Sequence, residues 1–407
     1  MMSSGVNRAG LPVWLIVVAC ATIAAIGMGL RQVMGLYLKP VTEWLGVGRE
    51  AFALAVAIAN IVWGLAAPFV GAVSDKYGTG RVVVFGAVCT AAGLAVMYAA
   101  TSDLDLFISG VLMGFGVAGA GVNAMVGAVG RAVPPGQRTA AIAALGMGSG
   151  IGIFVALPYA HLLIEQLGWQ ASLLVLAGTA MVMLPLAFAV SGKPTTHALA
   201  RQQTLREAVR EAFRHPSFWL LNAGFFVCGF HVVFYGVHLP AYVADKGLGN
   251  DVAVIALTVV GIGNLVGTYL AGQSAKIIEK RVGLSLIYLG RALIFLGFLF
   301  LPITATTVIL LSAGLGLLWL STVPLTSGLV ATFFGPTWMT MLYGIVFFSH
   351  QVGSFLGVWL AGRLFDITRS YDAMWWISVA LGLFAALVHW PIKERPVARL
   401  AAPTVPA

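Results

Sequence analysis

Acidic residues are scarce in this chain, and its long apolar segments hold none of them in their interior. Of 407 residues, only 14 are Asp or Glu, 9% are charged and 60% are hydrophobic. Two arginines, Arg31 and Arg291, and three histidines, His231, His238 and His350, do lie within these segments. A lone cation in hydrocarbon is costly unless it faces a cavity or a partner. Buried cations without buried anions therefore predict that an anion reaches them from outside the chain.

Cysteine and the motifs of nucleotide and metal chemistry are rare or missing. The three cysteines, Cys20, Cys89 and Cys228, have no CxxC neighbour, which argues against a disulfide framework and a cysteine metal site. The sequence contains neither a phosphate-binding GxxxxGK(S/T) loop nor HExxH. No nucleophile stands beside a plausible base. We therefore expect neither an enzyme nor a cofactor nor a metal.

What the sequence holds in abundance is apolar runs long enough to cross a bilayer. About 20 apolar residues span the hydrocarbon core as a helix, and lipid offers no partner for open backbone groups, which excludes irregular spans. The first run is too long for a cleavable signal peptide. We predict an all-α polytopic membrane protein with 12 transmembrane helices near 12–38, 49–74, 80–101, 106–131, 138–164, 169–191, 217–243, 252–275, 283–301, 305–330, 338–364 and 372–391.

The net charge of +9 indicates a membrane topology rather than a nucleic-acid partner. Most of the 23 lysines and arginines fall in segments that share one side of the membrane with both termini, whereas the opposite loops hold Lys39, Arg49, Lys246 and Arg369. This bias is the positive-inside pattern. We therefore expect an integral protein of the bacterial cytoplasmic (inner) membrane, with both termini in the cytoplasm.

A polar, basic stretch divides the apolar segments into two sets of six. Apolar residues recur on one face of Thr204–His215, which favours an interfacial helix, with a plain flexible linker as an equal alternative. We expect an N-terminal six-helix bundle over 1–191, a cytoplasmic linker over 192–216, and a C-terminal six-helix bundle with a short cytoplasmic tail over 217–407.

A loop motif after the second span provides a link to a known family. The motif consists of Gly71, Asp75, Lys76, Gly78 and Arg81. Its two basic residues recur 200 positions later as Lys276 and Arg281, which indicates a duplicated unit. The motif and the duplication resemble the major facilitator superfamily of secondary transporters. The resemblance implies a monomer of two pseudo-symmetric six-helix bundles and a gating role for the motif, with Gly71 permitting close helix approach and Gly78 a tight turn.

A narrower resemblance concerns the monocarboxylate and oxalate–formate branch of that superfamily. It rests on residues 75–84 and on Asn123 in a glycine-rich fourth span, where Asn123 is either a ligand contact or polar packing. Arg31 lies near the position where monocarboxylate transporters have a functional lysine. Those transporters also carry an Asp and an Arg in the eighth span, but residues 259–271 have no charge here, and Asn264 is their strongly polar residue.

Candidates for a central site follow from the resemblance, because helices 1, 4, 7 and 10 line the cavity in this superfamily. Arg31 in helix 1 can bind a carboxylate through its planar guanidinium, or it can extend to the outer headgroups. His231, Tyr235 and His238 share one face of helix 7 at positions i, i+4 and i+7. The histidines can exchange protons near neutral pH, or all three residues can serve as polar contacts between helices.

The C-terminal half adds further candidates: Trp319 and Ser321 in helix 10, His350 and Gln351 in helix 11, and Arg291 in helix 9. Pro324 predicts a kink in helix 10. His350 is the third candidate for proton coupling. Arg291 belongs to a helix that the resemblance places at the periphery, so it is either a substrate ligand or a structural residue. Arg363 and Asp366 are expected to form a surface pair.

Together these features favour a secondary active transporter that moves a small organic anion, a mono- or dicarboxylate, across the bilayer with protons by alternating access. A proton taken up by a buried histidine would add positive charge as the anion enters. An exporter of drugs or metabolites is the alternative, loosely supported by Gly146–Gly152 and Pro158 in the fifth span. A third alternative is a receptor or assembly factor built on a transporter fold.

Overall fold

A computed structural model describes residues 12–121, 124–126, 128–129, 133, 138–191, 203–335 and 338–400 of the protein. The regular secondary structure of these residues is helical. The N-terminal half contains α1 (Val13–Gln32), η1 (Val33–Tyr37), α2 (Leu38–Leu45), α3 (Arg49–Tyr77), α4 (Thr79–Tyr98), α5 (Asp103–Ala120), α7 (Arg138–Met181) and α8 (Met183–Ala189).

The C-terminal half follows a short connecting helix. That connector is α9 (Leu205–Phe213). The later helices are α10 (Pro216–Asp245), α11 (Asn250–Ser274), α12 (Lys280–Phe300), α13 (Ala305–Leu318), α14 (Thr322–Phe334), α15 (Met339–Thr368), α16 (Asp372–His389) and η3 (Ala398–Leu400).

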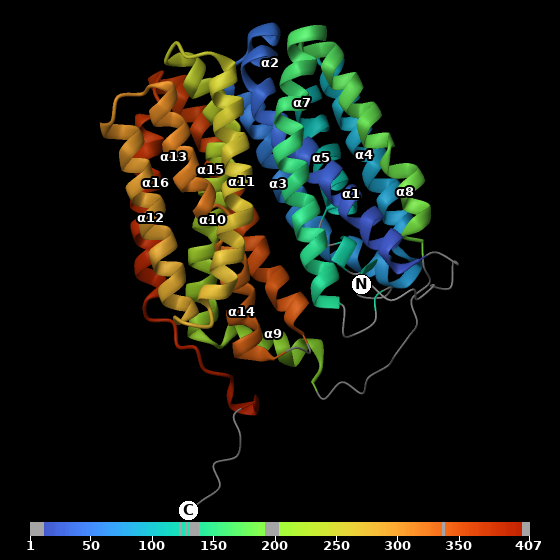
Figure 1. The fold of residues 1–407 in the computed structure, drawn as a ribbon, viewed down its shortest axis with the longest axis vertical. Helices are drawn as coiled ribbons and strands as arrows, with labels where there is room; N and C mark the ends of the chain where they lie inside the picture. The colour runs from blue at the N-terminus through green and yellow to red at the C-terminus, as the bar shows by residue number, and fades with distance from the viewer. Residues whose placement is uncertain are drawn as a thin grey trace, which may run out of the picture.

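Eleven helical segments among the described residues are long and apolar enough to cross a membrane, against twelve expected. The difference arises because the expected fifth and sixth spans form one continuous segment, Ala144–Ala189. Gly168 breaks the path of this segment with φ 79° and ψ 161°, and the chain runs along α7 and returns toward α8 (Figure 1). The predicted all-α polytopic membrane fold is confirmed.

Local sequence explains the connector and the break in helix 10. Thr204 and Glu207 form a reciprocal capping box at the start of α9, so of the two alternatives for 204–215 the helix is confirmed. The tenth expected span is interrupted between α13 and α14. Pro324 lies in the first turn of α14, where its missing N–H leaves no helical bond unmade. The break therefore falls just before the proline.

The helices form two groups that lie side by side (Figure 1). The groups meet where α3 packs against α15 and where α7 packs against α11. α9 and η3 lie near one end of the molecule, together with the start of α1, and α2 lies at the opposite end (Figure 1). We call these the α9 end and the α2 end.

The facing helices touch nearer the α2 end and diverge toward the α9 end. A Cβ built on Gly64 of α3 would lie 2.9 Å from Cβ of Gln351 in α15. Two turns further toward the α9 end, on the same faces of these helices, a Cβ on Gly71 or Gly344 would meet no described atom within 4 Å. The close helix approach predicted for Gly71 is therefore not found in this conformation.

Candidate functional site

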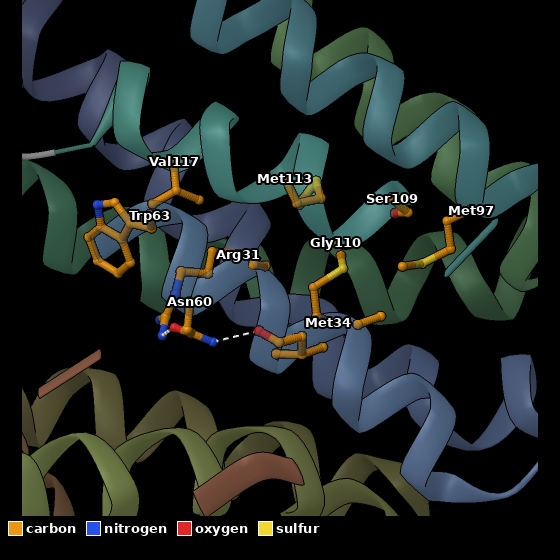
Figure 2. A pocket seen from close by; sticks show the side chains of 12 residues that line it. Arg31, Met34, Asn60, Trp63, Met97, Ser109, Gly110, Met113 and Val117 are labelled. Carbon is orange, nitrogen blue, oxygen red and sulfur yellow. Dashed lines mark hydrogen bonds between the residues drawn. The ribbon is translucent and has the colours of Figure 1, made fainter. Parts of the chain in front are cut away.

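Arg31 lies near the end of α1 and reaches α3 (Figure 2). Its Nη2 donates to Oδ1 of Asn60 at 2.9 Å, and its guanidinium carbon lies 5.2 Å from the centre of the Trp63 ring. Trp63 in turn meets Phe347 of α15 edge to face, with ring centres 5.1 Å apart. Asn60 is about 16 Å along α3 from the α2 end. The guanidinium is thus held within the span by a neutral amide and an aromatic ring.

A chain of hydrogen bonds links this arginine to the C-terminal half. Gln351 donates from Nε2 to the backbone oxygen of Asn60 at 3.0 Å. Its Oε1 accepts a hydrogen bond from Nδ1 of His350 at 3.0 Å. Of the three predicted proton carriers, His350 is therefore the one joined to Arg31. We call the residues of this group the Arg31 cluster: Arg31, Asn60, Trp63, His350 and Gln351.

Arg291 is fully buried at the break between α13 and α14. Its Nη2 donates to the backbone oxygens of Leu318, at 2.7 Å, and of Trp319. Those carbonyls end α13, and the negative end of a helix favours a cation. The same Nη2 lies 3.6 Å from Sγ of Cys228. In this conformation Arg291 caps a broken helix.

The polar stripe predicted on helix 7 exists on α10, but it faces helices of its own half. Nε2 of His231 lies 2.9 Å from a backbone oxygen of α16. The hydroxyl of Tyr235 lies 2.6 Å from Oγ of Ser312 in α13. Nε2 of His238 lies 2.9 Å from a backbone oxygen of α15. All three side chains are at most 1% exposed, and their contacts in this conformation are those of polar packing.

The remaining predicted residues of the cavity lie near the helix break or outside the described chain. Trp319 is 4% exposed and meets Tyr235 edge to face, with ring centres 5.9 Å apart. Oγ of Ser321 donates to a backbone oxygen one turn earlier at 2.6 Å, which satisfies a carbonyl at the break. Asn123 lies outside the residues that the structure describes.

The loop motif lies at the α9 end, between α3 and α4. Gly78 has φ 93°, so the predicted tight turn is present and requires glycine. Lys76 and Arg81 are exposed, and both lie over the ring of Tyr77, at 5.1 and 5.9 Å. The side chain of Asp75 lies outside the part that the structure describes.

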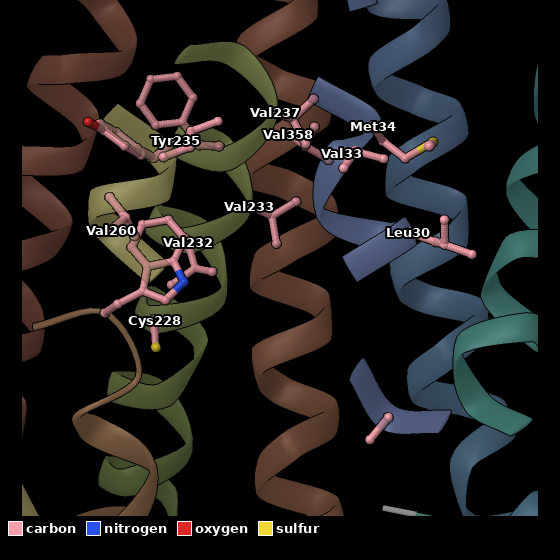
Figure 3. Packing of buried hydrophobic residues seen from close by; sticks show 14 of the residues in the cluster. Leu30, Val33, Met34, Cys228, Val232, Val233, Tyr235, Val237, Val260 and Val358 are labelled. Carbon is pink, nitrogen blue, oxygen red and sulfur yellow. The ribbon is translucent and has the colours of Figure 1, made fainter. Parts of the chain in front are cut away.

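An apolar layer closes the interface on the α2 side of the Arg31 cluster (Figure 3). The break from α1 to η1 lets Gly35 approach α10 so closely that a Cβ on it would lie 2.5 Å from the backbone oxygen of Gly236. Val33 of η1 lies beside Val237 of α10 and Val358 of α15, with Val233 nearby on α10 (Figure 3), and all four are at most 7% exposed.

An ionic network closes the α2 end beyond this layer. Arg49, at the start of α3, donates to both carboxylate oxygens of Asp245 in α10, at 2.6 and 2.7 Å. Arg49 also donates to the hydroxyl of Tyr371 at 2.9 Å. Asp366 of α15 accepts hydrogen bonds from the backbone N–H groups of Arg49 and Glu50, at 2.9 and 2.8 Å. We call Arg49, Glu50, Asp245, Asp366 and Tyr371 the Arg49 gate.

The gate corrects one expectation from the sequence. Arg363 and Asp366 were expected to form a surface pair, but each contacts α3 across the interface: Arg363 binds Glu50 at 3.1 Å, and Asp366 caps the helix. Sequence reasoning also missed Asn60, Trp63 and Asp245. The available signal was Asn60, a strongly polar residue within an apolar span, which could have been paired with Arg31.

Known proteins resemble this chain over most of its length. A family model described as Major Facilitator Superfamily matches residues 15–358. The uncharacterized MFS-type transporter YcxA of Bacillus subtilis (strain 168) is 26% identical over 401 residues, which cover 93% of this chain and 95% of that protein. Monocarboxylate transporter 11 of Homo sapiens is 26% identical over 398 residues, covering 92% of this chain and 82% of that protein.

Solved structures share the fold. A D-xylose–proton symporter has a TM-score of 0.75 at 16% identity, covering 95% of this chain and 100% of that one. A bacterial homolog of the human lysosomal transporter Spinster, in an inward-facing and unoccupied conformation, has a TM-score of 0.73 at 14% identity, covering 94% and 98%. The family match, the helical architecture and the relatives agree: this chain is a membrane transporter of the major facilitator superfamily, and not an enzyme.

Proposed function

We propose that this transporter moves a small organic anion, coupled to protons, and that the anion binds at Arg31. The observation that carries the proposal is the environment of Arg31. Its hydrogen bond goes to a neutral amide, and no carboxylate among the described side chains bonds its guanidinium. An ionisable residue within a membrane span is a functional-site hypothesis by default. Similarity to monocarboxylate transporters supports a carboxylate as the anion.

The chemistry of the guanidinium suits a carboxylate. Arg31 has five N–H donors in a planar fork, and the hydrogen bond to Asn60 uses Nη2. The side chain remains partly exposed. A carboxylate can therefore accept two parallel hydrogen bonds from the fork, the geometry that makes such pairs strong and directional.

The α2 end is closed and the helices diverge toward the α9 end, which supports assigning this conformation to one state of the transport cycle. Under the positive-inside rule, the basic α9 end faces the cytoplasm, so the diverging side of the interface faces inward in this conformation. The apolar layer and the Arg49 gate separate the Arg31 cluster from the outside. In the opposite conformation the gate opens, and the glycine faces at Gly71 and Gly344 come together.

His350 is the best placed of the predicted histidines for proton coupling. It lies on the hydrogen-bonded path from Arg31 through Asn60 and Gln351, whereas His231 and His238 bond within the C-terminal half. Protonation of His350 adds a second positive charge next to the anion. Binding is then tighter at low pH, and release is favoured where the pH is higher.

Uptake into proteoliposomes tests the proposal. Radiolabelled acetate, lactate and succinate are supplied with and without an inward proton gradient. We expect uptake of at least one anion, stimulated by the gradient, and a loss of about tenfold or more in affinity for Arg31→Gln, because a hydrogen bond to a charged group is removed. Arg206→Gln, a matched change at an exposed position in α9, should behave like the wild type.

Two outcomes contradict the proposal. Uptake that ignores both Arg31→Gln and the proton gradient excludes the anion site. Transport or stabilisation only by neutral lipophilic compounds favours the exporter alternative instead, with the buried arginines as structural residues.

A further inference from the structure

A cavity lies behind Arg31, inside the N-terminal half (Figure 2). Arg31 and Asn60 stand at one end of it, next to the C-terminal half. The cavity has a volume of about 30 Å³, and three methionines from three different elements form much of its wall: Met34 of η1, Met97 of α4 and Met113 of α5.

The rest of the wall includes the short residues Ala55 and Ala59 of α3 and Gly110 of α5. α5 packs so closely on α3 that a Cβ on Gly110 would collide with the backbone oxygen of Ala55. A Cβ on Gly114 would lie 2.6 Å from the backbone oxygen of Ala59. These helices cannot move apart or together without repacking, so the size of the cavity depends on the methionine side chains.

The interior of the cavity offers almost nothing polar. Ser109 lines it, but its hydroxyl donates to the backbone oxygen of Gly93 at 2.7 Å. Trp63 also lines the cavity, with its indole nitrogen on the side away from the methionines (Figure 2), and the other lining side chains beyond Arg31 and Asn60 are apolar. A water molecule needs two to four polar partners to be stable in a cavity. The apolar tail of a ligand bound to Arg31 needs no hydrogen-bond partner and can fill such a cavity.

We propose that this cavity holds the apolar tail of the transported carboxylate, and that Met34, Met97 and Met113 set the length of tail accepted. The proposal rests on the proposed function, since it needs the carboxylate to bind Arg31. The substrate class is then a monocarboxylate with a short aliphatic tail. A dicarboxylate is rejected because its second charge would enter a space without a free donor.

The volume limits the tail. A cavity of 150 Å³ lined by apolar side chains accommodates benzene, and this one is about 30 Å³. It has room for one or two methyl-sized groups at most. Methionine is flexible and fills irregular gaps, so slightly longer tails are tolerated with a penalty, whereas a six-carbon chain does not fit.

Binding of a homologous series tests the inference. The probes are the sodium salts of acetate, propionate, butyrate, hexanoate and succinate, with sodium chloride as the blank, titrated against the purified full chain in detergent. Burial of one methylene is expected to raise affinity about fourfold while the tail fits. Affinity should therefore rise from acetate to propionate and fall by hexanoate, with succinate weakest.

Substitutions of the wall methionines should then change the tail length that binds most tightly. Met97→Ala and Met113→Ala enlarge the cavity from two different helices and should shift the preferred tail toward butyrate or hexanoate, while Met113→Phe should restrict binding to acetate. Met147→Ala is the matched control, because Met147 is 57% exposed on α7. Met97→Val is a milder enlargement that keeps the test possible if an alanine variant does not fold.

The outcomes separate this inference from the function on which it rests. If no carboxylate binds the wild type, the proposed function itself fails. If carboxylates bind and Arg31→Gln abolishes binding, but the order of tail lengths is the same in the enlarged and restricted variants as in the wild type, the function stands and the tail site is wrong. An equal shift in Met147→Ala also overturns the tail site.

Discussion

Replacement of Arg49 by glutamine should release the α2 end. The change removes two hydrogen bonds to Asp245, at 2.6 and 2.7 Å, one to Tyr371 at 2.9 Å, and the contact of the guanidinium with the Phe365 ring at 3.7 Å. Breaking a buried ion pair costs about 3–5 kcal/mol. Asp245 is 26% exposed and keeps Lys39 at 3.8 Å, so we expect about 2 kcal/mol for this gate.

A change of about 2 kcal/mol shifts the balance between closed and open forms about thirtyfold. Spin labels at Leu104→Cys in α5 and Ile367→Cys in α15 report on it, because both sites are exposed near the α2 end and lie in different halves. The native cysteines are buried and can stay in place. The distance distribution between the labels should gain a longer component in Arg49→Gln.

Arg363→Gln is the matched control for this measurement. Arg363 contacts Glu50 across the same interface, but its side chain is 51% exposed, and exposed ion pairs contribute about 0–1 kcal/mol. Its distance distribution should stay close to that of the wild type. An unchanged distance distribution in Arg49→Gln, or an equal change in both variants, would refute the conclusion that Arg49 provides the main stabilisation of the closed gate.

Other predictions concern the remaining polar groups. Arg291→Lys should lower the midpoint of thermal unfolding, because an ammonium cannot match the contacts of Nε and Nη2 with the helix break; an unchanged midpoint would contradict the capping role. His350→Gln should abolish the stimulation of carboxylate uptake by an inward proton gradient, because His350 is the histidine joined to Arg31 through Gln351 and Asn60; retained stimulation would assign the proton elsewhere. Thr204→Ala should destabilise α9 by about 1 kcal/mol, seen as faster amide exchange confined to that helix. Burial lowers the pKa of His215, so the unfolded state takes up a proton first and stability should decline as pH falls below about 6.5; His215→Phe should show a smaller decline in unfolding midpoint.

The sequence predicts the features of a single helix better than it predicts the contacts between two helices. Apolar length located the spans, and the apolar face of residues 204–215 located α9. The helical period places His231, Tyr235 and His238 along one side of a helix, but their contacts go to three different helices, α16, α13 and α15. The neighbours that these side chains meet depend on how α10 is rotated within its half, which no local pattern encodes.

The partners of the buried arginines were unpredictable for the same reason. Asn60 meets Arg31 only because the long arginine side chain reaches from α1 to α3, and the two residues lie 29 positions apart. Arg291 meets carbonyls that become available only where helix 10 breaks, so the counterpart of its charge is a helix end and not a side chain. Residue types indicated that cations were buried, but the fold decides which groups each of them contacts.

The cap that Asp366 supplies to α3 gives the gate a built-in reporter. The first N–H groups of a helix have no partner within the helix itself, and here the other half of the protein provides one for Arg49 and Glu50. When the halves part at this end, both amides lose their acceptor and the first turn of α3 is free to fray. Hydrogen exchange at these two amides should therefore report the opening of the α2 end in the unlabelled protein, residue by residue.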